Sequence, residues 1–204
     1  AKERLPDEKT LSYLDSSARP GFLGWVTSTD HKRIGILYLA SMMTMFWVAV
    51  ALGVLMRIEQ LTTGPTIMGP AAYNAMFTVH GVIMVFMFVI PGLPAVFGNF
   101  FLPILIGAED VSFPKLNLLS WYCFITGAAL AVVSLFAGAG APDTGWSFYA
   151  PYSLRTGTNV SLALVAAFIL GFSSILTGIN FITTIHRMRA PGMGMMKMPV
   201  FTWT

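Results

Sequence analysis

Long apolar segments alternate with short polar ones along most of this chain, and the pattern predicts membrane-spanning helices. A hydrocarbon core of about 30 Å needs roughly 20 helical residues, each rising about 1.5 Å. Four segments meet this length: Ile34–Met56, Ala75–Ile106, Leu118–Ala141 and Val160–Ile185. They define a four-span region, residues 34–198, and residues 199–204 are expected to begin a fifth span. We therefore predict an all-α polytopic membrane protein.

The polar residues 1–33 precede the first span and hold six of the twelve basic residues. They contain no apolar stretch that could serve as a signal sequence, so they are expected to form a cytoplasmic-side extension. With that end inside, ten basic residues fall inside and only Arg57 and Arg155 fall outside. Because cytoplasmic loops of membrane proteins are enriched in Lys and Arg, this asymmetry predicts a cytoplasmic N-terminus.

The second apolar segment contains Pro91, Pro94 and Pro103. Each proline lacks a backbone N–H group, so this helix is expected to bend and to need neighbours that satisfy the freed carbonyl groups. Such a helix belongs inside a larger bundle.

Composition agrees with a bilayer environment: 55% of the 204 residues are hydrophobic and 10% are charged. An ordinary soluble domain is less apolar and more charged. The net charge of +3 mostly reflects the basic inner segments, so the sequence gives no support to a nucleic-acid partner.

His80 is an imidazole within the second span, and Arg57 ends the first span at the same membrane face. An ionisable side chain inside a membrane is costly, so it is a functional candidate by default. The neighbouring Gly81 is expected to let a flat cofactor approach. The alternative is a structural histidine that hydrogen-bonds to another helix. His31 and His186 are expected at the inner water interface.

Asp110 follows His80 by thirty residues, up to about 45 Å if the chain is fully helical, and is therefore expected at the inner surface. Side-chain amides and hydroxyls can hold a chain of water molecules towards mid-membrane. Four such side chains are candidates: Asn99, Asn117, Ser173 and Ser174. The alternatives are that Asn117 caps a helix and that the serines bond neighbouring helices.

Several stretches occur in an order that is more specific than any one of them. They are TDHKRIG (29–35), LMRIE (55–59), FTVHG (77–81), FGN (97–99), IGAED (106–110), FPKLN (113–117), GW (145–146) and INFITT (179–184). From about Ser28 to Thr204 the chain resembles the N-terminal third of subunit I of the haem-copper oxidases, of the aa3 cytochrome c oxidase type.

This resemblance implies that His80 is an axial ligand of the low-spin haem a and that Arg57 hydrogen-bonds its formyl group. It implies that Asp110 is the entrance of a proton channel, with Asn99 and Asn117 at its constriction and Ser173 and Ser174 higher up. Glu59 and Gly64 match positions that in some members help to bind calcium or sodium near the outer face.

The resemblance also implies a high-spin haem a and a copper ion, held by further histidines. No span here offers another histidine, so that centre is expected in the remainder of a protein of about twelve spans. The implied partners are oxidase subunits II and III, the lipid bilayer, cytochrome c and a respiratory supercomplex. The polar N-terminal extension favours a bacterial cytoplasmic membrane over the mitochondrial inner membrane.

Quinol-oxidising members of the family place polar side chains on the first two spans to bind the quinone. The corresponding residues here cannot hydrogen-bond a quinone through their side chains: Val48, Leu52, Ala72 and Ala75. We therefore expect cytochrome c to be the electron donor, with quinol as the alternative.

Glu109 stands where relatives usually carry an uncharged residue, so two carboxylates are adjacent at the expected channel mouth. Like charges that face the same way titrate as a pair. We expect a more proton-attracting entrance if both side chains face the same way.

Two other functional classes remain open. A four-helix haem protein that only transfers electrons would normally use paired histidines within the membrane, and these are absent. A transporter or structural membrane subunit would explain the helices but not the placement of Arg57 and His80 at one face.

Overall fold

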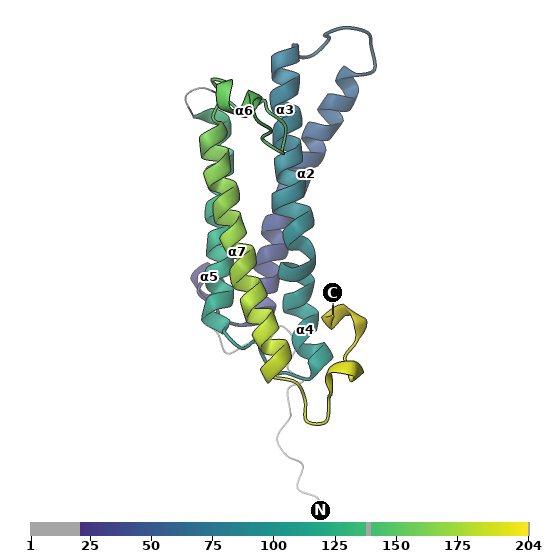
Figure 1. Ribbon diagram of the computed structural model, residues 1–204, viewed down its shortest axis with the longest axis vertical. Coiled ribbons are helices and arrows are strands. Elements are labelled where there is room, and N and C mark those ends of the chain that lie inside the picture. The colour runs from purple at the N-terminus through teal and green to yellow at the C-terminus, as the bar shows by residue number, and fades with distance from the viewer. Residues whose placement is uncertain (1–20, 138–139, 204) are drawn as a thin grey trace, which may run out of the picture.

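The computed structural model describes residues 21–137 and 140–203, so most of the predicted N-terminal extension lies outside the described residues. Within these ranges the chain is helical and contains no strand. Four long helical segments are apolar enough to cross a membrane: α2 (His31–Glu59), the continuous segment Pro70–Ile106, α5 (Pro114–Phe136) and α7 (Val160–Arg187). The predicted all-α fold with four spans is confirmed (Figure 1).

The helix ends differ from the ends of the apolar segments because local capping decides them. α2 begins at His31, where the Asp30 carboxylate accepts a hydrogen bond from the Lys32 N–H group. The second span begins at Pro70. Proline suits the first turn of a helix, because the backbone N–H group that it lacks would have no partner within the helix there. His80 therefore lies about three turns into its helix.

The second span consists of α3 (Pro70–Val82), two π-helical segments and α4 (Asn99–Ile106). The π-helical segments, η1 (Ile83–Val89) and η2 (Gly92–Gly98), surround and include the first two prolines. A proline removes the N–H group that the carbonyl four residues earlier needs, whereas a π turn pairs that carbonyl with the residue five positions later. The predicted irregularity is therefore present, and the wider turns accommodate it within the helix.

Side chains from all four spans form one apolar core between the helices. It includes Tyr38 and Met42 of α2, Met87 of η1, Phe124 of α5 and Leu170 of α7, all at most 5% exposed. Figure 1 shows α5 and α7 side by side along their length, beside α2 and the second span. The outward faces remain apolar, as lipid or further helices require.

Glycines permit two of the closest helix contacts. A Cβ atom on Gly127 of α5 would lie 2.7 Å from Leu170 Cγ of α7. A Cβ atom on Gly98 would overlap the Phe181 ring of α7. These positions hold α7 against both α5 and the second span.

Shorter elements cover the two ends of the bundle. α1 (Phe22–Val26) precedes α2 at what we name the inner end, and α6 (Tyr152–Arg155) lies in the loop at the opposite, outer end. After α7 the chain folds back, and the Ala190 N–H group donates to the Ile106 carbonyl. Two 3-10 turns follow, η3 (Met195–Lys197) and η4 (Val200–Thr202). A fifth span beginning in residues 199–204 stays a prediction.

Candidate functional site

His80 is held against α2 by a hydrogen bond to the backbone. Its Nδ1 atom lies 2.8 Å from the Ala49 carbonyl oxygen. A carbonyl oxygen can only accept a hydrogen bond, so Nδ1 carries the proton and the lone pair of the neutral ring lies on Nε2. This second hydrogen bond is how proteins commonly fix the tautomer and the orientation of a metal-binding histidine.

Small residues on α2 make room for the His80 ring. Ala49 is fully buried, and a Cβ atom on Gly53 would lie 3.1 Å from His80 Cε1. Ala49, Gly53 and Arg57 follow one another at intervals of four residues, so they share one face of α2. Arg57 is therefore one turn further towards the outer end, where its guanidinium group donates to Gln60 Oε1 at 3.4 Å.

The expectation that Gly81 leaves space for a cofactor is wrong. A Cβ atom at Gly81 would lie 3.0 Å from both Cβ and Cδ1 of Trp146, so this side of the helix is filled. Successive helical residues point about 100° apart, and Gly81 faces the outer loop whereas His80 faces α2. Gly53 has the role of accommodating the ring.

A haem fits the donor groups that these residues present. Among residues 21–137 and 140–203 no group of three or more His, Cys, Asp or Glu side chains could hold a bare metal ion. A porphyrin supplies four nitrogen ligands itself and needs only an axial group from the protein. A single imidazole of fixed tautomer, with its Nε2 lone pair available, meets that need.

At the inner end, Asp110 is paired with His31. Asp110 Oδ1 lies 2.9 Å from His31 Nδ1 and also accepts a hydrogen bond from the Val111 N–H group at 2.7 Å. Asp110 lies at the inner end of the bundle and remains partly exposed, whereas His31 is buried within the chain. The expectation for His31 placed it at this end but missed its pairing, because the partners are 79 residues apart.

Asn99 and Asn117 meet between the second span and α5. The Asn117 Nδ2 group donates to Asn99 Oδ1 at 2.5 Å, and both residues are fully buried. Asn117 lies in the fourth position of α5 and does not cap it, since Phe113 is the N-cap residue. Asn117 Oδ1 has no hydrogen-bond partner. A buried acceptor left without a protein partner is typical of a site that holds water.

The buried polar groups continue from Asn117 towards mid-membrane. Ser120 Oγ donates to the Asn117 carbonyl at 2.6 Å, and Ser173 Oγ donates to the Ser120 carbonyl at 2.7 Å. The Tyr38 hydroxyl lies 2.9 Å from Ser120 Oγ and 3.0 Å from Ser173 Oγ. Ser174 does not join this group, because it lies on the exposed side of α7.

Sequence reasoning missed four members of this arrangement: Tyr38, Ser120, Asn180 and Thr184. Asn180 Oδ1 and Thr184 Oγ1 accept hydrogen bonds from the backbone N–H groups of Phe113 and Ser112. Helical spacing could have identified Asn180 and Thr184. Ser173, Thr177, Asn180 and Thr184 follow at intervals of three or four residues, which places one polar stripe on α7.

A family profile described as "Cytochrome C and Quinol oxidase polypeptide I" matches residues 33–204. The chain belongs to the haem-copper oxidase subunit I family.

Relatives within this family match nearly the whole chain. A Streptomyces avermitilis protein named "Probable cytochrome c oxidase subunit 1-alpha" is 42% identical over 182 residues, which are 88% of this chain and 31% of the relative. "Cytochrome c oxidase subunit 1" of Cereibacter sphaeroides is 40% identical, over 90% of this chain and 38% of its own. "Heme-copper oxidase subunit I+III" of Aeropyrum pernix is 40% identical, over 90% of this chain and 23% of the relative. The chain thus spans about a third of the length of such relatives.

In this haem-copper oxidase chain, Glu59 anchors the loop between α2 and α3. Its carboxylate accepts hydrogen bonds from the backbone N–H groups of Thr66, Ile67 and Met68 at 2.8, 2.7 and 3.1 Å. Gly64 turns the same loop with a φ angle of +85°, which favours glycine. A calcium or sodium site at Glu59 and Gly64 stays a prediction.

Glu109 and Asp110 differ in their surroundings. Glu109 is exposed, whereas Asp110 is turned towards the buried His31. The two carboxylates therefore share the inner end of the chain, but of the two only Asp110 contacts the buried His31 side chain.

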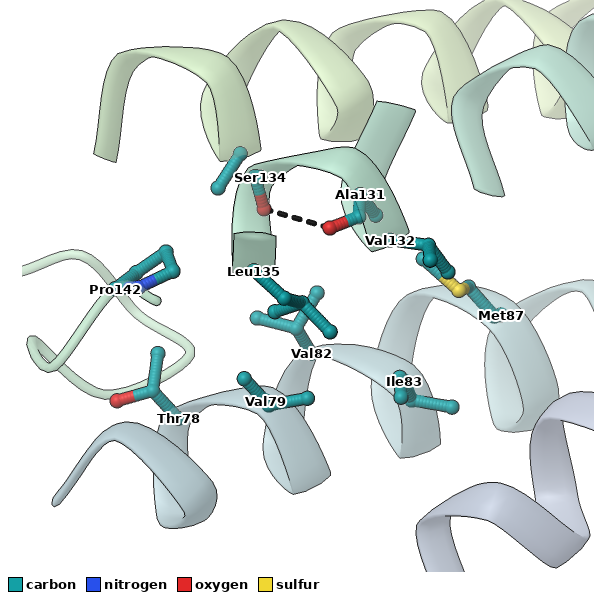
Figure 2. A pocket seen from close by; sticks show the side chains of 11 residues that line it. Thr78, Val79, Val82, Ile83, Met87, Ala131, Val132, Ser134, Leu135 and Pro142 are labelled. Atoms are coloured by element: carbon teal, nitrogen blue, oxygen red, sulfur yellow. Dashed lines mark hydrogen bonds between the residues drawn. The ribbon is translucent and has the colours of Figure 1, made fainter. Parts of the chain in front are cut away.

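A small cavity lies on the other side of the second span from His80. Figure 2 shows Val79, Val82 and Ile83 of that span facing Leu135 of α5 across it. No charged side chain lines it, and the Ser134 hydroxyl donates to the Ala131 carbonyl at 2.6 Å. Its lining offers no group for the chemistry of an oxidase.

Proposed function

We propose that this chain is the N-terminal part of the catalytic subunit of a respiratory terminal oxidase. The complete enzyme oxidises cytochrome c, reduces oxygen to water and pumps protons. The observation that carries the proposal is the His80 ring inside a membrane span, with Nδ1 bonded to the Ala49 carbonyl and Nε2 left as a ligand. Family membership over residues 33–204 supports it.

In this proposal His80 is an axial ligand of the low-spin haem a. The bound haem supplies one-electron transfer, whose potential depends on the axial ligand and on nearby hydrogen bonds and charges. Ala49 and Gly53 hold and accommodate the imidazole, and Arg57 on the same face of α2 would hydrogen-bond the formyl group of a bound haem. The high-spin haem a and copper belong to the remainder of the protein.

Asp110 admits protons from the inner side in this proposal. His31 lies within hydrogen-bond distance of its carboxylate and can exchange a proton with it. Asn99 and Asn117 form the narrow part of the channel, and the unpartnered Asn117 Oδ1 supports a water molecule there. Ser120 and Ser173 then continue the path with Tyr38. Ser174 stays a proposed member of the path, although its side chain lies on the exposed side of α7.

The proposed orientation places the inner end of the bundle in the cytoplasm of a bacterium. Lys115, Arg187 and Lys197 lie at the end where α2 begins, and Arg57 and Arg155 lie towards the outer end. This distribution follows the enrichment of basic residues on the cytoplasmic side. Streptomyces and Cereibacter relatives support a bacterial membrane.

The proposed partners are subunits II and III, with electrons arriving from cytochrome c, and a supercomplex can bring that donor close. The name "Heme-copper oxidase subunit I+III" of the Aeropyrum relative supports subunit III as a neighbour. Val48 and Ala72, both exposed on the first two spans, offer no side-chain hydrogen bond to a quinone.

Oxygen uptake by the complete purified oxidase tests the proposed activity and donor. We expect rapid uptake with reduced cytochrome c and little uptake with a quinol, because a quinone would lack side-chain partners at these positions. Cyanide-inhibited samples provide the blank. Preferential uptake with quinol would contradict the proposed donor, and no uptake with either donor would contradict the oxidase.

A further inference from the structure

The outer loop between α5 and α7 contacts the second span at Thr78, two residues before His80, and at Gly81, the residue after it. The Gly145 N–H group donates to Thr78 Oγ1 at 2.8 Å. Trp146 packs directly against Gly81, where an added Cβ atom would lie 3.0 Å from Trp146 Cβ. The helical turn that carries His80 is therefore held by α2 on one side and by this loop on another.

The conformation of the same loop depends on Asp143, two residues before Gly145. The Tyr152 hydroxyl donates to Asp143 Oδ2 at 2.7 Å. The hydroxyls of Thr156 and Thr158 donate to Asp143 Oδ1 at 2.9 and 3.1 Å. One carboxylate thus joins the start of the loop to α6 and to the segment that leads into α7.

The outermost residues of the loop bury little apolar surface. Tyr149 and Leu154 are 78% and 81% exposed. Trp146 is 44% exposed and makes an edge contact with Phe86 at a centroid distance of 6.3 Å. Hydrogen bonds to an ionised carboxylate are stronger than those between neutral groups. Pro142 is buried and Phe148 packs against the core, so the Asp143 bonds act mainly on the more exposed part of the loop, from Tyr149 to Thr158.

We propose that Asp143 is a positioning residue for the His80 site: through Tyr152, Thr156 and Thr158 it fixes the loop that holds the helical turn carrying His80. The inference rests on the proposed function, in which His80 binds the low-spin haem. Orientation of an axial imidazole and the groups around it tune a metal centre. Loosening the loop should therefore alter the haem without removing its ligand.

Spectroscopy and redox titration of the complete oxidase test this inference. In Asp143→Ala the absorption maximum and the midpoint potential of the low-spin haem are expected to shift. Asp143→Asn keeps one acceptor oxygen and is expected to give a smaller shift. A role limited to overall stability would lower the unfolding temperature and leave both haem properties unchanged.

Thr78 provides an independent variant on the helix. Thr78→Val removes the acceptor for the Gly145 N–H group and is expected to reproduce the shift, whereas Thr78→Ser keeps the hydroxyl and restores the parent values. Thr44→Val is the matched control. Thr78 donates to the Asn74 carbonyl of its own helix at 2.8 Å, and Thr44 likewise donates to the Ala40 carbonyl at 2.9 Å but is exposed. It is expected to cause no shift.

Unchanged maxima and potentials in haem-loaded Asp143→Ala and Thr78→Val would overturn the inference. If Asp143→Ala does not assemble, Asp143→Asn takes its place beside Thr78→Val in this comparison. His80→Ala separates the two proposals. Retention of the low-spin haem in that variant would overturn the His80 assignment, whereas its loss alongside unshifted Thr78→Val would overturn only the role of Asp143.

Discussion

At the residue scale, hydrogen-bond partners add to the distinction that membrane depth makes between His80 and His31. His80 donates from Nδ1 to a backbone carbonyl, which leaves the lone pair of its other nitrogen available. His31 shares a short contact with the Asp110 carboxylate, which suits proton exchange. The partner of each ring therefore indicates its chemistry better than its depth in the membrane does.

Glu109 adds a second carboxylate beside Asp110, and its effect can be measured separately. Because Glu109 is exposed, Glu109→Gln should leave the Asp110–His31 contact in place and remove only a nearby negative charge. We expect slower proton uptake with an altered pH dependence, since a negative charge attracts protons to the entrance. Rates of proton uptake against pH in the parent and variant oxidases provide the measurement. Superimposable profiles would eliminate a role for Glu109.

At the element scale, caps, prolines and glycines determine how the apolar segments become packed helices. The existence of four spans could be predicted, because a bilayer requires about 20 apolar residues per helix. The ends of the helices could not be predicted in this way. Asp30 determines the start of α2 by a local hydrogen bond, and Pro114 determines the start of α5 by its geometry. The π-helical segments near Pro91 likewise arise because proline leaves backbone carbonyl groups without a partner, which the pattern of hydrophobic residues does not reveal.

Gly127 tests how closely α5 and α7 must approach. Gly127→Ala would place a methyl group 2.7 Å from Leu170 Cγ, so we expect a loss of about 1–3 kcal/mol in stability. Thermal unfolding of the detergent-solubilised protein measures it. Gly171→Ala in α7 is the control, because its added methyl group would meet no atom within 4 Å and alanine favours a helix. Equal unfolding temperatures for the two variants would contradict the close contact.

Acidification should release the outer loop through Asp143. Desolvation alone would raise the pKa of Asp143, but hydrogen bonds from Tyr152, Thr156 and Thr158 outweigh it and lower the pKa. The carboxylate therefore stabilises the fold above its ordinary pKa of about 3.9. That contribution is lost as pH falls through the lower folded-state value.

Hydrogen–deuterium exchange of residues 141–158, corrected for the intrinsic effect of pH, measures this release. Protection should stay constant from neutral pH to about pH 5 and fall below about pH 4. In Asp143→Asn the loop should be less protected at neutral pH and should lack this acid transition. An identical transition in that variant would assign it to another group.

At the scale of the whole molecule, the two candidate sites occupy opposite ends of one bundle. The second span links them, since it carries His80 near its outer end and leads to Asp110 at its inner end. The sequence predicts this separation from helix length alone. It does not predict the contacts of Tyr38 with Ser120 and Ser173, because those pairs are 82 and 135 residues apart and depend on how the spans pack.

The central claim is that His80 Nε2 binds the iron of a low-spin haem. Electron paramagnetic resonance with nitrogen hyperfine detection on the oxidised, complete oxidase tests it directly, with ¹⁵N-labelled histidine to identify the imidazole. We expect hyperfine coupling from two axial imidazole nitrogens in the parent, and loss of the low-spin signal in His80→Ala at unchanged subunit content. An unaltered low-spin signal in His80→Ala would contradict the account.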